Sequence, residues 1–226
     1  TTGSDPDLGP YYSGLSYDFR NVSPTSGSNI DMRVTVSLNN PADYDYVGSF
    51  PEFNDGDLGV LYQYDGNRNV SGGGTVNMIG GLEYTLTFYQ GGGTFTNEVE
   101  LSAVRLLIYD VDGDEAQSES VRAYKSDGLV GFQLPIIGGI TQTYDPLTQS
   151  YKFTGPGVNR DERDASGAFI LHFQDTSSIR LTMEANTFID KKTDHMINGA
   201  FSAIDGDLSC IDETKFHPIP EPSTAF

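Results

Sequence analysis

The segment Ile30-Asp31-Met32-Arg33-Val34-Thr35-Val36-Ser37-Leu38 alternates apolar and polar side chains at every step. In an extended chain, successive side chains point to opposite faces, so the alternation gathers the apolar residues on one face and the polar residues on the other. In a helix the same residues would be spread around the circumference. The segment therefore predicts a β-strand with one face against a core and the other in solvent.

The same period of two recurs on both sides of this segment, at Leu15, Tyr17 and Phe19, and at Leu82, Tyr84, Leu86 and Phe88. Further expected strands are short, rich in β-branched and aromatic residues and bounded by Gly, Asn, Asp or Pro. They are 58–64, 75–79, 101–109, 119–124, 129–134, 149–154, 168–174, 178–185 and 199–204. No window has a sustained helical repeat with caps, and 26 glycines interrupt the chain. The pattern predicts an all-β protein, an antiparallel two-sheet β-sandwich of jelly-roll type with very little helix.

The domain organisation follows from where the alternation stops. No composition break divides the middle of the chain, so residues 15–208 are expected to form one sandwich domain. Residues 1–14 form an N-terminal arm whose polar beginning lacks a signal-like apolar run, as expected if a targeting peptide has been removed. Residues 209–226 are expected to form an extended tail, because its prolines disfavour helix at the residues before them.

The charge balance narrows the possible partners. The chain has 13 Lys plus Arg against 32 Asp plus Glu, a net charge of −19. Such a surface repels phosphate backbones, which excludes nucleic acid as a partner, and it disfavours a bare anionic membrane. Divalent cations are favoured by the same argument. A single cysteine, Cys210, cannot form an internal disulfide, so stability must come from packing, metal binding or assembly.

The tail carries a short motif, Ile219-Pro220-Glu221-Pro222-Ser223-Thr224. It resembles the Pro-Glu-Pro signature that opens the PEP-CTERM sorting signal of exosortase-processed bacterial proteins. A plain proline-rich tail is the alternative, and the rest of the chain has to be interpreted from its own residues. In that family a transmembrane helix and a basic cluster follow the motif. The resemblance therefore implies that the signal was cut or processed before the helix. It also implies that the protein contacts the membrane only through that missing segment. It also implies export by a Gram-negative-type bacterium that makes exopolysaccharide, and residence on the surface or in the extracellular matrix.

An acidic loop follows the expected strand 101–109. It contains Asp110, Asp112 and Asp114 at alternate positions, then Glu115 and Glu119. Carboxylates on a turning loop can converge on a hard cation such as Ca²⁺, which takes about 6–8 oxygen ligands. The spacing departs from an EF-hand, because the glycine stands at the fourth position and the late glutamate at the tenth. We expect a calcium loop of another type; a solvated acidic turn is the alternative.

Two other acidic groups give weaker signals. Asp161, Glu162 and Asp164 are interleaved with arginines, which favours surface ion pairs over a metal site. Asp205-Gly206-Asp207 has the composition of an ordinary turn.

A loop-like stretch at 43–57 combines aromatic and acidic residues. Tyr44 and Tyr46, with Asp55 and Asp57, could stack on the faces of sugars and bond to their hydroxyls. The chain has no tryptophan, the largest aromatic stacking surface, and packing of the same rings in a core or rim is the alternative. These four residues are the candidate glycan-binding set.

Enzymatic signatures are missing from the sequence. The three histidines, His172, His195 and His217, belong to no hydrolase or zinc motif, although a pair of the many carboxylates could serve glycoside hydrolysis. We therefore expect a non-enzymatic, secreted, calcium-stabilised structural or adhesive protein. Its expected partners are itself, with residues 1–10 adding as a strand to a neighbour's sheet to build fibres or sheets, and exopolysaccharide. A carbohydrate-binding module is the first alternative and a polysaccharide-cleaving enzyme the second.

Overall fold

The computed structural model describes residues 16–22, 29–39, 46–54, 57–64, 75–113, 117–136, 138–158, 164–190, 197–205 and 214–220. Nearly all regular structure in these ranges is β. The strands are β1 (Ser16–Phe19), β2 (Ile30–Asn39), β3 (Tyr46–Asn54), β4 (Asp57–Tyr64), β5 (Thr75–Gln90), β6 (Val104–Tyr109), β7 (Gln117–Tyr124), β8 (Leu129–Pro135), β9 (Thr141–Asp145), β10 (Ser150–Thr154), β11 (Phe169–Phe173), β12 (Ser178–Asp190), β13 (Ile197–Asp205) and β14 (Thr214–Pro218). Two short 3₁₀-helices, η1 (Lys125–Asp127) and η2 (Ala165–Gly167), complete the set. No helix within the described ranges is long and apolar enough to cross a membrane.

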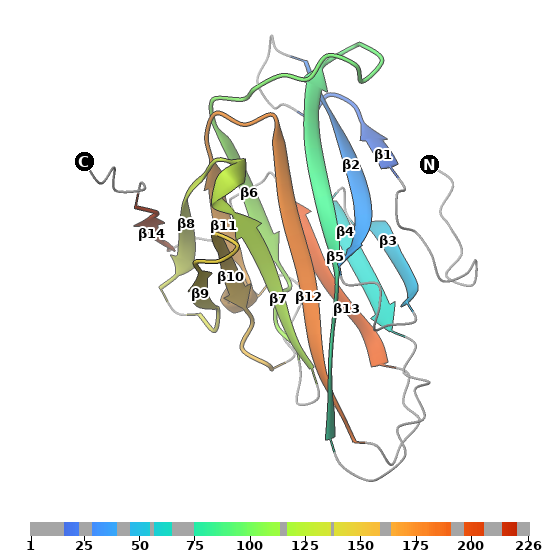
Figure 1. The fold of residues 1–226 in the computed structure, drawn as a ribbon, viewed down its shortest axis with the longest axis vertical. Coiled ribbons are helices and arrows are strands. Elements are labelled where there is room, and N and C mark those ends of the chain that lie inside the picture. Colours follow the sequence, from blue (N-terminus) through green and yellow to red (C-terminus); the bar gives the residue numbers. More distant parts are fainter. Residues whose placement is uncertain are drawn as a thin grey trace.

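The strands form two seven-stranded antiparallel sheets that lie face to face (Figure 1). Sheet A has the order β1-β2-β5-β12-β7-β10-β9 and lies in front in Figure 1. Sheet B has the order β14-β8-β11-β6-β13-β4-β3 and lies behind it. The predicted two-sheet β-sandwich is therefore confirmed.

The chain crosses between the sheets repeatedly, which gives the fold its jelly-roll character. From β5 to β13, it visits sheet A at β5, β7, the β9–β10 hairpin and β12, and sheet B at β6, β8, β11 and β13. Neighbouring strands in a sheet are consequently distant in sequence. β12, for example, pairs with β5 along its whole length, from Ser178↔Thr87 to Asp190↔Thr75.

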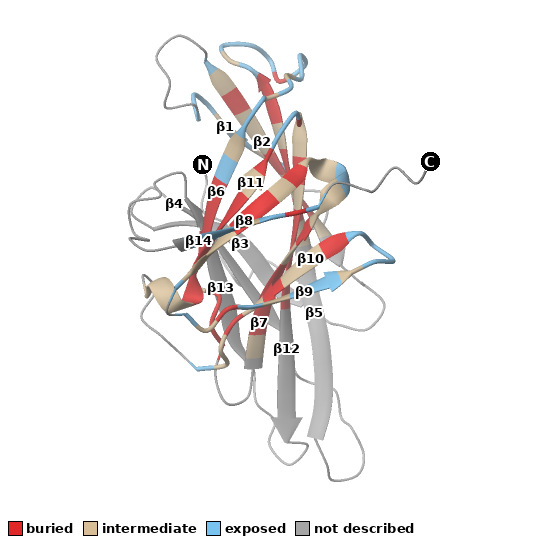
Figure 2. Cartoon of the chain, turned by 90° about the vertical axis from the view of Figure 1, so that its left-hand side faces the viewer, coloured by how far each residue is buried: buried red, intermediate tan, exposed pale blue. Residues whose placement is uncertain are grey.

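The core lies between the two sheets and is built from the alternating residues that the sequence pattern marks. Sheet A contributes Val34, Val36, Tyr84, Leu86, Phe88, Val121, Ala123, Phe153, Ile179, Leu181 and Met183, and sheet B contributes Leu106, Ile108, Leu129, Phe132, Phe169, Leu171 and Phe173. Phe153 of sheet A stacks on Phe169 of sheet B with ring centroids 4.5 Å apart. Figure 2 shows these buried positions running along the described strands, with exposed residues at the turns.

Three strands occur where none was expected, and two of the expected segments form a single strand. The stretch 43–57 was interpreted as loop-like, but residues 46–54 form β3 and pair with β4. Residues 141–145 form β9, and residues 214–218, expected to be part of the tail, form β14 at the edge of sheet B beside β8. The segments 75–79 and 82–88 are one continuous strand, β5, because its pairing with β12 runs unbroken through Gly80 and Gly81.

Candidate functional site

The acidic loop begins where β6 ends and turns sharply. Asp110 has a φ of 59° and Gly113 a φ of 87°, both in the left-handed region. Aspartate tolerates this conformation better than most residues, and glycine adopts it without steric cost. Between them, Val111 is fully buried and belongs to the core. The loop is therefore fixed to the sandwich by an apolar side chain.

Two carboxylates of the loop are buried beside each other. Asp112 is 8% exposed and Glu119, which lies on β7, is 4% exposed. Glu119 Oε2 accepts a hydrogen bond from the backbone N–H of Asp112 at 3.4 Å, and Asp112 Oδ1 accepts one from the N–H of Gly113. Each carboxylate thus lies against the backbone of residues 112–113, and the two negative charges share one small region.

Two further segments close around this region. Gly157 donates its N–H to Asp112 O at 2.8 Å, and Gly155 donates to Glu119 O at 2.9 Å. From the other side, Gly167 O accepts the N–H of Val111 at 3.0 Å. The acidic loop therefore lies between the segment 155–157 and the η2 segment, where Asp164 caps the helix by accepting the N–H of Ser166 at 2.8 Å.

Gly155 is required by this close approach. A β-carbon at Gly155 would lie 2.3 Å from Val111 O and 2.7 Å from the Cα of Asp112. Both atoms are backbone, so the loop itself would have to move. Absence of a side chain at residue 155 is what allows the two segments to touch.

The structure brings some of the predicted metal ligands together. Asp112 and Glu119 meet, and Asp110 immediately precedes the buried Val111, while Asp114 and Glu115 lie outside the described residues. Asp110, Asp112, Glu119 and Asp164 all take part in polar or electrostatic interactions. Within the described ranges, no three His, Cys, Asp or Glu side chains form a group that could hold a metal ion.

Sequence reasoning missed the segments that enclose the acidic loop. Asp164 was grouped with surface ion pairs, yet its segment bonds directly to the loop through Gly167. Gly155-Pro156-Gly157 was not singled out, although two glycines around a proline are a local sign of backbone packed closely against another segment. The clustered acidic residues are visible in the sequence, but the sheet topology determines which other segments pack against their loop.

The predicted glycan-binding residues are only partly described. Tyr44 and Asp55 lie outside the described residues. Tyr46 begins β3 and pairs with Tyr64, and Asp57 begins β4 and pairs with Asn54. The carbohydrate-binding role of this set stays a prediction.

Two histidines lie on sheet B. His172 Nε2 and Gln133 Oε1 are 3.0 Å apart across β11 and β8, and the imidazole meets the edge of the Phe216 ring. Burial, aided by the positive charge of Arg105, lowers the pKa of His172. His217 stacks on Phe132 at a centroid distance of 5.1 Å. His195 lies outside the described residues.

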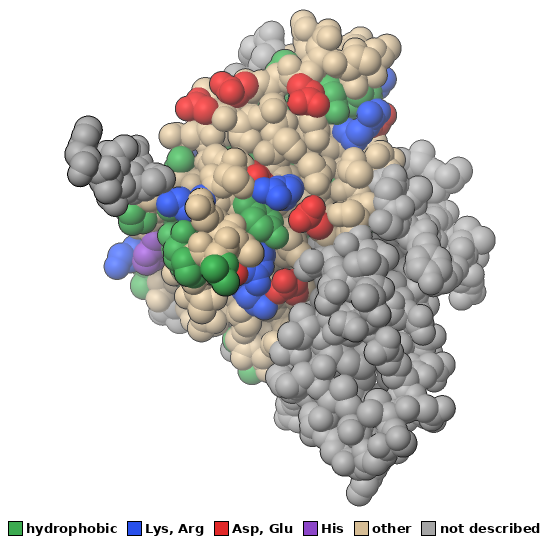
Figure 3. All heavy atoms as spheres, in the orientation of Figure 1, with side chains coloured by type: hydrophobic (Ala, Val, Ile, Leu, Met, Phe, Trp, Pro, Cys, Tyr) green, Lys and Arg blue, Asp and Glu red, His purple; other side chains and the backbone are tan. Residues whose placement is uncertain are grey.

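The outer face of sheet A is polar and carries both signs of charge. Lys152 Nζ lies 2.7 Å from Glu184 Oε2, and Arg122 lies 3.6 Å from both Glu184 and Asp145. Figure 3 shows basic and acidic side chains interspersed over this face, with hydrophobic side chains gathered toward the left, where β9 and β10 lie in Figure 1. Opposite charges compensate one another here, unlike in the chain as a whole.

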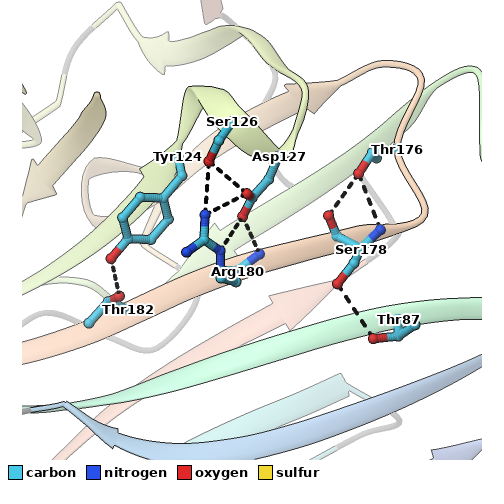
Figure 4. A network of polar contacts seen from close by, with 8 residues as sticks. All are labelled: Thr87, Tyr124, Ser126, Asp127, Thr176, Ser178, Arg180 and Thr182. Atoms are coloured by element: carbon cyan, nitrogen blue, oxygen red, sulfur yellow. Dashed lines mark hydrogen bonds and ion pairs between the residues drawn. The ribbon is translucent and has the colours of Figure 1, made fainter. Parts of the chain in front are cut away.

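A polar network ties η1 to this face (Figure 4). Arg180 on β12 donates to both carboxylate oxygens of Asp127 and to Ser126 Oγ, and its guanidinium lies 4.5 Å from the centre of the Tyr124 ring. Tyr124 Oη is 2.8 Å from Thr182 Oγ1. The network fixes the connection between β7 and β8.

Comparison with known proteins gives little to transfer. No protein-family model matches the chain, and no curated protein matches it. Among solved structures, the chain is similar to the adhesin domain of PrgB from Enterococcus faecalis, with a TM-score of 0.37 and 12% identity over 84% of this chain and 69% of that chain. A likeness of this extent carries no argument about what the chain binds.

Proposed function

We propose that this chain is a secreted structural or adhesive β-sandwich of the bacterial surface or extracellular matrix, stabilised by calcium at the acidic loop. The observation that carries the proposal is the pair of buried carboxylates, Asp112 and Glu119, at a junction of three backbone segments. The function of such a site is to hold the sandwich together at the point where β6, β7 and η2 meet.

The electrostatic argument favours a cation at this junction. Asp112 and Glu119 each accept a backbone N–H, and a divalent cation between the two carboxylates would offset the repulsion between their charges. Carboxylates are among the oxygen ligands that calcium prefers, and the loop supplies several of them. A chain with a net charge of −19 also concentrates divalent cations at its surface. Asp112 and Glu119 would be the protein ligands from the described residues, with Asp110, Asp114 and Glu115 as the other candidates from the loop.

The attachment of the C-terminal segment supports display on a surface. Ile219 is buried in the core and donates its N–H to Val130 O at 2.9 Å, and Lys125 Nζ donates to Pro220 O at 2.9 Å. The Pro-Glu-Pro motif therefore begins directly at the folded body.

The experiment is a calorimetric melt of chelator-stripped protein with and without millimolar calcium. A site loaded at a hundred times its Kd stabilises by about 2.7 kcal/mol, which corresponds to a rise in Tm of roughly 5–10 °C for a domain of this size. We expect this rise in the natural chain and its loss in Asp112→Asn and in Glu119→Gln. Light scattering on the same samples reports calcium-bridged assembly.

Asp127→Asn is the matched control. Asp127 is also acidic and largely buried, but it is paired with Arg180 away from the loop. This variant should melt at a lower temperature yet keep the full calcium increment. An unchanged Tm of the natural chain on addition of calcium would overturn the proposal.

A further inference from the structure

The described strands leave four sheet edges, at β1 and β9 in sheet A and at β3 and β14 in sheet B. Soluble proteins protect such edges with charge, proline, bulges or very short strands, because an edge strand offers its backbone to another chain. Three of the four carry such protection. β14 contains Lys215 and Pro218, β3 contains Pro51, and β1 is four residues long and carries Asp18.

β9 has the weakest protection of the four: it is one residue longer than β1, and its single charge, Asp145, stands at its last position and is bound within the turn that follows. Its sequence, Thr141-Gln142-Thr143-Tyr144-Asp145, has no lysine or proline, and its pairing with β10 is regular over all five residues. Three of the five residues are exposed. Tyr144 is 44% exposed, and Leu147, in the turn that follows, is 94% exposed. A weakly protected edge thus lies beside exposed apolar side chains.

We propose that β9 is an association edge for a second copy of this chain. The two β9 strands would pair antiparallel, so that the seven-stranded sheet A continues into the sheet A of its partner. This deepens the proposed structural role, on which it rests, by naming where one molecule meets the next. The second copy is the occupant that the side chains and charges of this edge favour.

A symmetric register suits the sequence of β9. With Thr143 opposite Thr143 of the second copy, Gln142 lies opposite Tyr144 and Thr141 opposite Asp145. No like charges face each other directly, a condition for stable cross-strand pairs. Asp145 is already held within its own turn, by the N–H of Leu147 at 2.9 Å and by the hydroxyl of Thr148 at 2.8 Å. The pairing therefore needs no rearrangement of the hairpin.

The charge distribution favours this end of the sandwich, where the edges β9 and β14 lie, and of these two only β14 carries a lysine and a proline. The elements at this end of the sandwich, β7, η1, β8, β9, β10 and β14, contain the basic residues Arg122, Lys125, Lys152 and Lys215 and the acidic residues Glu119, Asp127 and Asp145. The local balance is near neutral, whereas the whole chain has a net charge of −19. Two copies that approach through this end avoid the repulsion that opposes approach elsewhere.

The pairing is expected to be weak in solution, because one five-residue strand forms a small interface and interfaces below roughly 1,200 Å² are transient. Disulfide trapping is therefore the appropriate test. Cys210 is the only cysteine, so Cys210→Ser gives a background without thiols. In the symmetric register, the two Cα atoms of residue 143 would be about 4.5–5.5 Å apart, within the range that a disulfide spans.

We expect Thr143→Cys in the Cys210→Ser background to form a covalent dimer under mild oxidation. Thr141→Cys is the register control, because its two copies would be roughly 13 Å apart in this pairing. Ser16→Cys on β1 is the edge control, since Ser16 is exposed on the opposite edge of the same sheet. Both controls should remain monomeric. Thr143→Lys in the natural background should abolish any self-association seen in sedimentation velocity.

All samples are oxidised both with chelator and with calcium, so that the result does not depend on whether calcium binds at the acidic loop. Trapping of Thr143→Cys in chelator alone supports the β9 edge even if calcium has no effect on Tm. Absence of a Thr143→Cys dimer at high protein concentration overturns the inference. Equal trapping of all three variants also overturns it, because that result indicates random collision. A third outcome is that Thr143→Lys abolishes self-association although Thr143→Cys forms no covalent dimer. This result indicates that another occupant binds the edge, such as residues 1–10 of a neighbour or a polysaccharide, and it likewise overturns symmetric pairing.

Discussion

Arg180 and Asp127 meet through two parallel hydrogen bonds, Nε to Oδ2 at 2.9 Å and Nη2 to Oδ1 at 2.7 Å. The same carboxylate also accepts the backbone N–H of Arg180 at 2.9 Å. One acidic side chain in the η1 turn thereby satisfies both the main chain and the side chain of a residue on β12. The hydrogen bond and charge of Asp127 raise the pKa of Arg180.

Replacing Arg180 by lysine should lower the free energy of unfolding by about 1–2 kcal/mol, because a lysine keeps the charge but cannot form the fork with Asp127. Urea denaturation measures the change. Arg33→Lys is the matched control, since Arg33 also bonds both oxygens of a carboxylate, Asp18, but in an exposed pair. Exposed pairs contribute roughly 0–1 kcal/mol, so the control should lose less. Equal losses would contradict a special role for the Asp127 pair.

His172 should make stability depend on pH. Its lowered pKa means that the unfolded chain takes up a proton at a higher pH than the folded protein does. The stability contributed by the neutral imidazole is complete above the unfolded pKa of about 6.5 and is lost as the pH falls toward the lowered folded pKa. We expect His172→Gln, which can still bond to Gln133, to flatten the change in unfolding free energy between pH 7.5 and pH 5. An unaltered slope would show that other groups cause the pH dependence.

Gly155→Ala should destabilise the fold, because its methyl group would collide with Val111 O and the Cα of Asp112. Overpacking of this kind costs about 1–3 kcal/mol, measurable by chemical denaturation. Gly167→Ala is the comparison, since it approaches the same loop with room, its new Cβ lying 3.4 Å from Val111 O. A similar loss in both variants would argue against the tight contact at residue 155.

Phe153→Ala should be among the most damaging single changes. The side chain is fully buried and touches the rings of Phe169 and Phe132, at 4.5 and 5.0 Å between centroids. Truncation of a buried phenylalanine costs about 3–5 kcal/mol. Phe216→Ala serves as the control, because Phe216 is 46% exposed and should cost far less. A small effect at residue 153 would mean that the two sheets are less tightly packed there than the ring contacts indicate.

The sequence predicts the sheets better than it predicts the contacts between loops. Val34 and Val36 are buried as their alternation requires, since period two alone decides which face a residue occupies. The same pattern places Asp31 in solvent, yet Asp31 is buried because it accepts the N–H groups of Asn21 and Gly92. Such bonds join residues far apart in the chain, and no local pattern encodes them.

The candidate site and the C-terminal strand show the same difference between what the local sequence indicates and what depends on distant contacts. Asp112 and Glu119 stand out in the sequence as nearby acidic residues, but the segments that pack against them come from elsewhere in the chain: Gly155 follows β10, and Gly167 ends η2. β14 escaped prediction because Thr214–Pro218 includes a lysine, a histidine and a proline. These residues are tolerated since the strand lies at an edge, and a strand's place in a sheet cannot be read from its own sequence.

The distance in sequence between paired strands has a kinetic consequence. Thr87 and Ser178 are partners on β5 and β12 although 91 positions separate them. Closing a loop of this length costs conformational entropy before the native contacts can offset that cost. Sheets with this connectivity therefore fold slowly, on the scale of milliseconds to seconds. β12 also completes the pairing of β7, so sheet A stays open until the chain has been delivered beyond residue 180. A chain that is synthesised or exported N-terminus first would therefore emerge largely unfolded, and the sandwich would assemble late.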